Sequence, residues 1–247
     1  MPGLAAPGAG AGPTLVMVPG WGMHSGMWGG FARTLARHFT LVHWDLPGHG
    51  LAPSPRSWDP VEWLGEPAGG AFWLGWSLGG QLLTALAARR PERVRGLVLL
   101  AANPRFVAAA DWPGMDPPLF DAFRRQLRED PPATLRRFLA LITQGAPRPV
   151  AREARRLWRS APSPAPADLS RGLDLLGRLD LRSRLGEICC PVLIVGGEGD
   201  VLVPPAALRR SAALFPEARF VLVRAGGHVP FLVEPDGLAD RIRTALL

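Results

Sequence analysis

Hydrophobic residues recur along this chain in short uninterrupted runs, separated by helix-like stretches. Runs in which apolar and polar residues do not alternate are typical of strands buried on both faces of a parallel sheet. Strands that alternate with helices predict a doubly wound α/β domain with a mostly parallel sheet. The predicted strands are Leu15–Val18, Leu41–Trp44, Ala71–Leu74, Leu97–Leu100, Val192–Val195 and Phe220–Val223, and the predicted helices are Met27–Arg37, Gln81–Arg89, Ala206–Leu214 and Asp236–Ala245.

The alternation stops between residues 105 and 185, where helical patterns are joined by Pro-rich segments and no strand-like run occurs. Because this segment lies between two predicted strands of the sheet, it predicts a helical lid inserted over the strand ends. Its predicted helices are Asp116–Arg128, Ala133–Thr143, Val150–Arg159 and Leu169–Leu176.

The predicted organisation is therefore a core made of residues 14–104 and 186–247, with the lid at 105–185. Residues 1–13 are rich in Gly, Ala and Pro and carry no basic n-region, so we expect a flexible tail and not a signal peptide. The connection over residues 51–70 is poor in helix formers and leaves room for only a short helix near Val61.

The chain has 247 residues, 47% of them hydrophobic, which is enough for one sizeable core or a core with an inserted lobe. No apolar stretch approaches membrane-spanning length, so we expect no membrane association. The two cysteines, Cys189 and Cys190, are adjacent, and neighbouring cysteines rarely form a disulfide. These features favour a reduced, cytoplasmic protein, which we expect to be a monomer.

Positive charge is concentrated in the predicted lid. All 28 basic residues are Arg, and residues 105–185 hold 15 Arg against 9 Asp or Glu, which is a net charge of +6 out of the total of +7. This distribution indicates an acidic partner that meets the lid, although an ordinary solvated Arg-rich face has the same composition. No basic motif interleaved with aromatic residues is present, so nucleic-acid binding is not expected.

The sequence Gly-Trp-Ser-Leu-Gly at positions 75–79 follows a predicted strand and precedes a predicted helix. A strand, a sharp turn and a helix around G-x-S-x-G form a nucleophile elbow, in which the strained turn exposes the serine hydroxyl at the top of the sheet. Gly75 and Gly79 provide the space that such a turn needs. We therefore predict that Ser77 is a catalytic nucleophile.

A serine nucleophile needs a base, and the base needs an orienting acid. Asp200 follows the predicted strand Val192–Val195, and His228 lies in a Gly-containing loop after the next strand. The order serine, acid, histidine is that of the α/β-hydrolase fold, so we predict Asp200 as the acid and His228 as the base. Glu198 is the competing acid. Structural or surface roles are expected for His24, His38, His43 and His49, and a structural turn for the segment that begins at Asp45.

Acyl transfer also requires donors for the developing oxyanion. The amide of Leu78, directly after the nucleophile, is one predicted donor. The second is the amide of Trp21, in the Gly-rich loop after the first predicted strand. The alternative for that loop is a simple Gly-rich turn with a packed tryptophan. This chemistry needs no metal and no organic cofactor.

Several segments resemble the pimeloyl-acyl-carrier-protein methyl ester esterases of biotin synthesis, and the similarity extends over almost the whole chain from Leu15. They are the elbow Trp73–Gly80, the segments Ala102–Phe106 and Asp111–Met115, and Arg137–Leu141. The resemblance implies an α/β-hydrolase fold and a triad of Ser77, Asp200 and His228. It implies hydrolysis of the methyl ester that masks the pimeloyl carboxylate, with an acyl-carrier protein as partner.

Further site residues follow from the same resemblance. It implies oxyanion and substrate contacts at Trp21 and Leu78. It also implies acyl-chain contacts at Phe138, Leu139, Ala140, Leu141 and Ile142, and carrier-protein contacts at Arg137, Arg155 and Arg152 or Arg156. The chain departs from the pattern at Pro19, where His is usual, and at Ile142, where Gln is typical.

Other functions share parts of this pattern. A broad short-chain carboxylesterase and a carbon–carbon bond hydrolase would use the same triad. Haloalkane and epoxide hydrolases use Asp at the position of Ser77, so the serine disfavours them. A catalytically silent ligand-binding protein of this fold is the alternative outside enzymes, and the complete triad argues against it.

Overall fold

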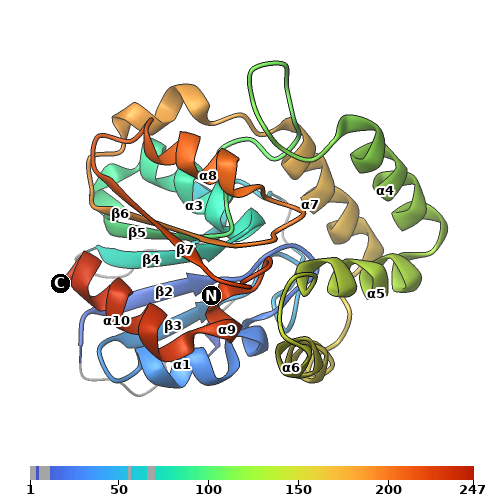
Figure 1. Ribbon diagram of the computed structural model, residues 1–247, viewed down its shortest axis with the longest axis horizontal. Coiled ribbons are helices and arrows are strands. Elements are labelled where there is room, and N and C mark those ends of the chain that lie inside the picture. Colours follow the sequence, from blue (N-terminus) through green and yellow to red (C-terminus); the bar gives the residue numbers. More distant parts are fainter. Residues whose placement is uncertain (1–3, 6–11, 55–56, 66–69) are drawn as a thin grey trace.

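A seven-stranded sheet forms the centre of the molecule in the computed structural model, which describes residues 4–5, 12–54, 57–65 and 70–247 (Figure 1). The strand order is β1-β3-β2-β4-β5-β6-β7, and all strands are parallel except β1, which pairs antiparallel with β3. Every predicted strand is present. The strands are β1 Leu4–Ala5, β2 Thr14–Val18, β3 Thr40–Trp44, β4 Ala71–Trp76, β5 Val94–Leu100, β6 Val192–Gly197 and β7 Ala218–Val223.

Burial along the strands follows their place in the sheet. The central strands β4 and β6 are buried at every position, as their uninterrupted apolar sequences predict. Strand β7 is different, because it lies at the edge of the sheet and Leu222 is exposed there. The expectation of burial on both faces is therefore wrong for Phe220–Val223, where only Val223 is fully buried.

Helices cover both faces of the sheet, as expected for a doubly wound domain (Figure 1). One face is covered by α1 Gly29–Leu35, α9 Pro230–Val233 and α10 Pro235–Leu246, and the other by α3 Leu78–Arg89 and α8 Pro205–Ala212. The short helix predicted near Val61 is α2 Pro60–Trp63. Three 3₁₀ segments also occur in the described part of the chain, at Ser25–Trp28, Pro91–Arg93 and Arg182–Glu187.

The predicted helix Met27–Arg37 is interrupted. A 3₁₀ turn ends at Trp28, and α1 starts at Gly29, which has φ +51°. A side chain at this glycine would also approach Leu157 of the helical insertion to 2.9 Å. The positive φ and the close neighbour together explain why a continuous helix does not form.

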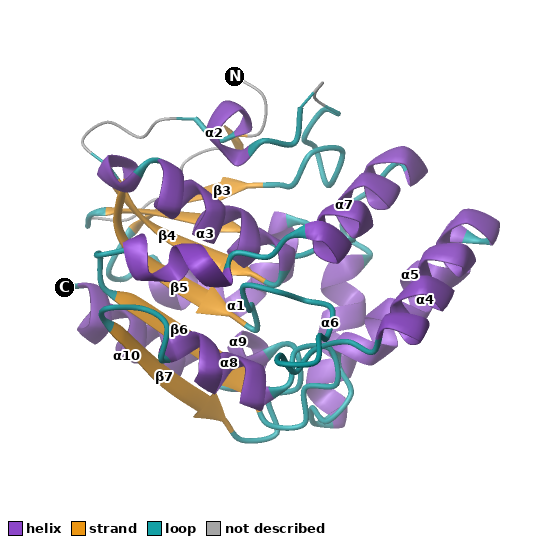
Figure 2. Ribbon diagram, turned by 90° about the horizontal axis from the view of Figure 1, so that it is seen from above, coloured by secondary structure: helices purple, strands orange, loops and turns teal. Residues whose placement is uncertain are grey.

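Four helices lie beyond one end of the strands and correspond to the predicted lid helices (Figure 2). They all fall within residues 105–185, which we call the helical insertion. The described part of that segment contains no strand, only isolated bridges such as the one between Arg105 and Asp180. The helices are α4 Pro117–Glu129, α5 Pro131–Ile142, α6 Arg148–Trp158 and α7 Pro166–Arg178.

The N-terminal segment is not a flexible tail throughout. Leu4 and Ala5 pair with Trp44 and His43 of β3, which corrects the expectation for residues 1–13 at these two positions. The described part of the chain leaves out residues 1–3, 6–11, 55–56 and 66–69. Pro55, Pro67 and Gly69 of the 51–70 connection are among these residues. Among the described helices, none has the length and apolarity needed to cross a membrane.

Candidate active site

The predicted site residues gather at the carboxyl ends of four parallel strands. Trp21 follows β2, Ser77 follows β4, Asp200 follows β6 and His228 follows β7. Strand order reverses at β2, because β3 lies on one side of it and β4 to β7 on the other. Binding sites of open α/β sheets form at such reversals, beyond the carboxyl ends of the strands.

Ser77 sits in a strained turn between β4 and α3. Its φ and ψ are 54° and −120°, which a non-glycine residue rarely adopts, and its amide donates a 2.9 Å hydrogen bond to the carbonyl of Leu100. Side chains at the flanking glycines would clash with backbone: at Gly75 with Gly80 Cα at 2.5 Å, and at Gly79 with the carbonyl oxygens of β2 and its loop, also at 2.5 Å. The G-x-S-x-G spacing therefore has a steric cause here.

Asp200 and His228 form a buried pair. The His228 Nδ1 and the Asp200 Oδ2 are 2.8 Å apart, and the side chains of both residues are almost fully buried. The other carboxylate oxygen, Oδ1, accepts from the amides of Leu202 and Val203 at 2.9 and 3.0 Å. The competing acid, Glu198, is exposed and does not reach the imidazole. Asp200 is thus oriented by the loop that follows β6.

The backbone of His228 connects the two sides of the site. Its carbonyl accepts a 2.8 Å hydrogen bond from the indole of Trp76, the residue before Ser77, and its amide donates to the carbonyl of Ile142 at 3.1 Å. The imidazole Nε2 is buried and has no hydrogen-bond partner among the described residues. In particular, Ser77 Oγ and His228 Nε2 are not hydrogen bonded. The nitrogen that would accept the serine proton has no competing donor.

The loop after β2 lies directly against Ser77, the predicted nucleophile. A side chain added at Gly20 would come within 3.1 Å of Ser77 Cβ. The Met23 amide donates to the carbonyl of Gly20, and the Trp21 indole donates to the carbonyl of Leu169 on α7 at 2.8 Å. Within the described residues the Trp21 amide has no acceptor, and Leu78, as the first residue of α3, has no acceptor inside its helix. Both predicted oxyanion donors are therefore free to bind a ligand.

An apolar cavity of about 370 Å³ extends from this loop into the helical insertion. Trp21 forms part of its wall, and its ring contacts Phe138 and Phe123 edge-on at centroid distances of 4.9 and 5.5 Å. The exposed residues Leu119 and Val201 also line the cavity, so it opens to solvent beside them. The other residues that line it are Phe106, Met115, Phe120, Ala122, Gln126, Leu141, Gln144, Leu173, Leu176 and Leu202.

Only two of the five predicted acyl-chain contacts line this cavity. They are Phe138 and Leu141. Ala140 is exposed, Leu139 and Ile142 are buried in the core, and none of the three lines this cavity, so the contacts expected from them stay predictions. Residues three or four apart share a helix face, and only part of a five-residue run can face one cavity. The same rule applied to the apolar positions of α4 and α7 indicates the lining residues that these two helices contribute, such as Phe123 and Leu173.

The predicted carrier-protein contacts are exposed on α5 and α6, which pack against each other. Arg156 forms a two-pronged ion pair with Glu153 on its own helix, with both N–O distances at 2.7 Å. For Arg137, Arg152 and Arg155, no ion pair with a carboxylate occurs in the described structure. These three guanidinium groups are therefore available to a partner.

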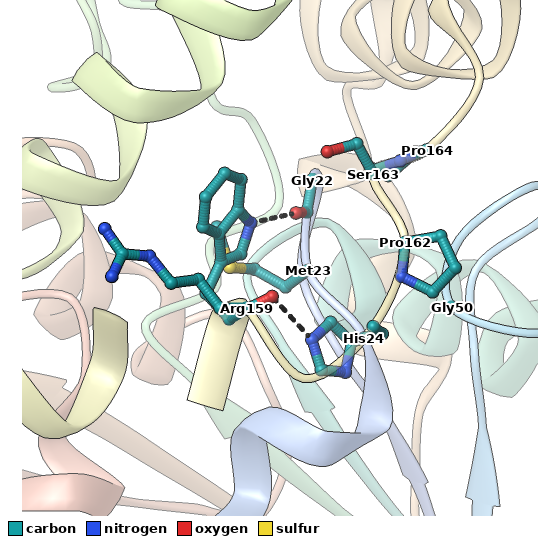
Figure 3. A pocket seen from close by; sticks show the side chains of 10 residues that line it. Gly22, Met23, His24, Gly50, Arg159, Pro162, Ser163 and Pro164 are labelled. Carbon is teal, nitrogen blue, oxygen red and sulfur yellow. Dashed lines mark hydrogen bonds between the residues drawn. The ribbon is translucent and has the colours of Figure 1, made fainter. Parts of the chain in front are cut away.

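A second, smaller cavity of about 200 Å³ is also lined by the loop after β2 (Figure 3). Gly22, Met23 and His24 form one wall, and the segment that follows α6, from Arg159 to Pro164, forms the other. The indole of Trp158 donates to the carbonyl of Gly22 at 3.3 Å, and His24 Nε2 lies 3.1 Å from the carbonyl of Trp158. The helical insertion is thus hydrogen bonded to this loop on two sides.

The remaining titratable groups have structural surroundings. The carboxylate of Asp45 accepts from the amide of Ser25, in keeping with the structural turn expected there. Cys189 and Cys190 are free thiols, and burial raises the pKa of Cys190 to about 11. No group of three His, Cys, Asp or Glu side chains in the described residues could hold a metal ion.

Comparison with known proteins identifies the lineage. The sequence profile of the alpha/beta hydrolase fold matches residues 13–235. The chain is 41% identical to the pimeloyl-[acyl-carrier protein] methyl ester esterase of Xanthomonas oryzae pv. oryzae (strain MAFF 311018) over 245 residues, which cover 96% of this chain and 94% of that protein. It is also 41% identical to the protein of the same name from Nitrosomonas europaea, with 92% of this chain and 93% of that protein covered.

Solved structures agree on the fold. An esterase from Exiguobacterium antarcticum superposes with a TM-score of 0.82 at 22% identity, covering 96% of this chain and 92% of that chain. The enol-lactonase from Burkholderia xenovorans LB400 gives 0.77 at 20% identity, with 96% and 92% covered. At such identities the likeness concerns the fold alone. The identity to the curated esterases goes further, and the chain belongs to the pimeloyl-[acyl-carrier protein] methyl ester esterase family of α/β hydrolases.

Proposed function

We propose that this protein hydrolyses the methyl ester of pimeloyl-acyl-carrier protein, releasing methanol and free pimeloyl-acyl-carrier protein for biotin synthesis. The observation that carries this proposal is the 41% identity, over 96% of the chain, to an esterase with that substrate in its name. The arrangement of side chains at the strand ends supports it, because it supplies each group that ester hydrolysis needs.

In the proposed mechanism Ser77 attacks the ester carbonyl while His228 accepts its proton through Nε2. Asp200, 2.8 Å from Nδ1, fixes the ring orientation and stabilises the imidazolium. The amides of Leu78 and Trp21 receive the oxyanion, and each such donor typically contributes about 3 kcal/mol to transition-state stabilisation. Methanol leaves with the proton from His228. Water then attacks the acyl-enzyme by the same route, and His228 again accepts and returns the proton.

The helical insertion is proposed as the lid that holds the acyl chain. Its cavity is lined largely by apolar side chains and reaches the loop of Trp21, which suits a methylene chain whose ester lies at Ser77. Phe138 and Leu141 are the proposed chain contacts from α5. We propose that Arg137, Arg152 and Arg155 bind the acidic carrier protein, with Arg156 contributing less because Glu153 already pairs with it.

The proposed partner and the two unpaired thiols support a cytoplasmic location. We infer that the protein acts as a monomer, since the proposed triad and both oxyanion amides come from one chain. Gel filtration with light scattering measures this directly.

The decisive experiment is rescue of a biotin auxotroph that lacks its own esterase. We expect growth without biotin when the wild-type protein is expressed and none with Ser77→Ala at equal protein level. Purified protein should release methanol from pimeloyl-acyl-carrier-protein methyl ester. Rescue by Ser77→Ala would contradict the nucleophile. Failure of the wild type to rescue, combined with good hydrolysis of p-nitrophenyl butyrate, would instead indicate a broad short-chain esterase.

A further inference from the structure

His49 lies outside the proposed triad, yet it is fully buried and bonded to the loop that carries the Trp21 amide. Its Nε2 lies 3.0 Å from the amide nitrogen of Gly22, and its Nδ1 lies 2.8 Å from the carbonyl oxygen of Pro47. A backbone amide is only a donor, so Nε2 must accept. The proton therefore resides on Nδ1 and is donated to Pro47. One neutral tautomer satisfies both hydrogen bonds.

The backbone around Gly22 shows what this contact controls. The bond from the Met23 amide to the Gly20 carbonyl closes a four-residue turn with Trp21 and Gly22 at its centre. Gly22 has φ +70°, whereas Trp21 is not among the residues with positive φ, which defines a type II turn. Type I and type II turns differ by a flip of their central peptide. Because the Gly22 amide belongs to that peptide, the acceptor at His49 selects its orientation.

The same turn is held from several directions. The Gly22 carbonyl accepts from the Trp158 indole on α6, a bond drawn in Figure 3, and the Trp21 side chain bonds to Leu169 on α7. The His49 imidazole is the contact that comes from the core and not from the helical insertion. It therefore supplements the two contacts from the insertion.

The segment that carries His49 is itself fixed. Gly48 has φ +67°, and a side chain there would collide with the carboxylate of Asp168 in the first turn of α7. Asp168 is 1% exposed and accepts from the Ser54 hydroxyl. The His49 ring also lies edge-on to Trp58, with centroids 6.1 Å apart. These contacts hold the His49 side chain in one orientation, as a residue that positions a neighbouring group requires.

We propose that His49 is a positioning residue for the oxyanion hole: by accepting the Gly22 amide it fixes the turn from which the Trp21 amide points toward the reacting carbonyl beside Ser77. This deepens the proposed function and rests on its serine-esterase chemistry. Because the oxyanion exists only after attack, the contact matters more for kcat than for KM.

The test compares His49→Phe with His49→Gln, using p-nitrophenyl butyrate as the ester. Phe fills similar space and keeps the contact with Trp58, but it cannot accept a hydrogen bond. The Gln side-chain oxygen can reach the position of Nε2 and accept from Gly22. We expect His49→Phe to lower kcat roughly 10- to 100-fold with KM within about twofold, since loss of a whole oxyanion donor costs about 100- to 1000-fold. His49→Gln should stay within about fivefold of wild type.

Inhibitor binding separates positioning from general stability. A trifluoromethyl ketone forms a tetrahedral oxyanion on the serine, so its Ki should rise in His49→Phe by the same factor as kcat/KM falls. The matched control is His43→Phe, a half-buried imidazole on β3 whose Nδ1 has no partner among the described residues; it should leave kcat and Ki unchanged. Thermal unfolding confirms that each variant is folded at the assay temperature.

The proposal is overturned if His49→Phe retains kcat within twofold, if kcat falls while Ki does not change, or if His49→Gln is as impaired as His49→Phe. If the wild-type protein hydrolyses no ester and does not bind the trifluoromethyl ketone, the proposed function is refuted instead. The two failures are therefore distinguishable by the wild-type measurement alone.

Discussion

At the residue scale, the glycines of the nucleophile elbow are determined by backbone contacts and not by flexibility. A Cβ at Gly79 would lie 2.5 Å from the carbonyl oxygens of both Val18, the last residue of β2, and Pro19, the next residue, and such backbone atoms cannot shift at low cost. The first turn of α3 can approach the loop of Trp21 only because residue 79 has no side chain. The same approach places Leu78, the first residue of α3, beside the end of β2.

Replacing this glycine tests the close approach. We expect Gly79→Ala to lower the free energy of unfolding by roughly 1–3 kcal/mol, the usual cost of overpacking, and to reduce kcat because the Leu78 amide shifts with the helix. The measurement is denaturant unfolding together with ester hydrolysis. Gly186→Ala is the matched control, since nothing lies within 4 Å of the added carbon, and it should change the unfolding free energy by less than about 0.5 kcal/mol.

Burial of His49 also makes stability depend on pH. Burial lowers the pKa of His49 from 6.5 to about 4 and outweighs the opposing effects of the Pro47 carbonyl and Asp168; the facing His24 lowers it further. Between these pH values the unfolded chain binds a proton at His49 that the folded chain does not. The stability contributed by the neutral imidazole is therefore present above pH 6.5 and is lost as the pH falls toward 4.

We expect the contribution of this one residue to the unfolding free energy to fall by up to about 3 kcal/mol between pH 6.5 and 4, at about 1.4 kcal/mol per pKa unit. Urea unfolding across this range in wild type, His49→Phe and His49→Gln measures it. Both variants lack the titrating group, so both should show a shallower loss of stability in acid. Identical slopes in all three proteins would mean that His49 is not neutral and buried in the folded state.

At the scale of elements, the sequence predicts well those features that a local pattern of residues determines. The strands, the four helices of the insertion and the strand-end positions of Ser77, Asp200 and His228 all follow from apolar runs, turn residues and chain order. The break at Gly29 and the edge position of β7 depend on Leu157 and on strand order, which are tertiary facts. His49 was expected to be structural, but its link to Gly22 joins residues 27 positions apart that no local pattern connects.

The cavity within the insertion is an element-scale feature with its own test. Ala122 lines the cavity from α4, so Ala122→Trp should fill part of its volume of about 370 Å³. We expect kcat/KM for methyl esters of long acyl chains to fall at least about tenfold, while p-nitrophenyl acetate, which does not reach α4, is hydrolysed as by wild type. Arg128→Trp, which is exposed on the same helix and lies away from the face of Ala122, controls for added bulk. Equal losses for short and long esters would show that the acyl chain does not bind there.

At the scale of the whole molecule, most of the net charge and the proposed catalytic residues belong to different parts of the chain. The net charge of +6 carried by residues 105–185 belongs to the helical insertion, while Asp200, His228 and Ser77 are contributed by the loops at the strand ends. The insertion nevertheless contacts the loops of the proposed site, because the carbonyl of Ile142 accepts from the amide of His228 and that of Leu169 accepts from the Trp21 indole. The insertion, to which we propose that the partner binds, is thus directly hydrogen bonded both to the proposed base and to the proposed oxyanion loop.

This separation predicts different responses to salt for two substrates of one active site. Carrier-linked pimeloyl methyl ester should lose kcat/KM as ionic strength rises from 0.05 to about 0.5 M, because added ions screen attraction between the exposed Arg residues and an acidic partner. Free dimethyl pimelate carries no charge and should show little change. Replacing Arg137, Arg152 and Arg155 with Gln should lower kcat/KM for the carrier-linked ester and flatten its salt dependence without affecting the free ester.

The control for this replacement is Arg156→Gln, which should have a smaller effect because Glu153 already neutralises that side chain. Equal salt dependence for both substrates would mean that the Arg-rich surface is only a solvated face and that the acyl chain alone provides recognition.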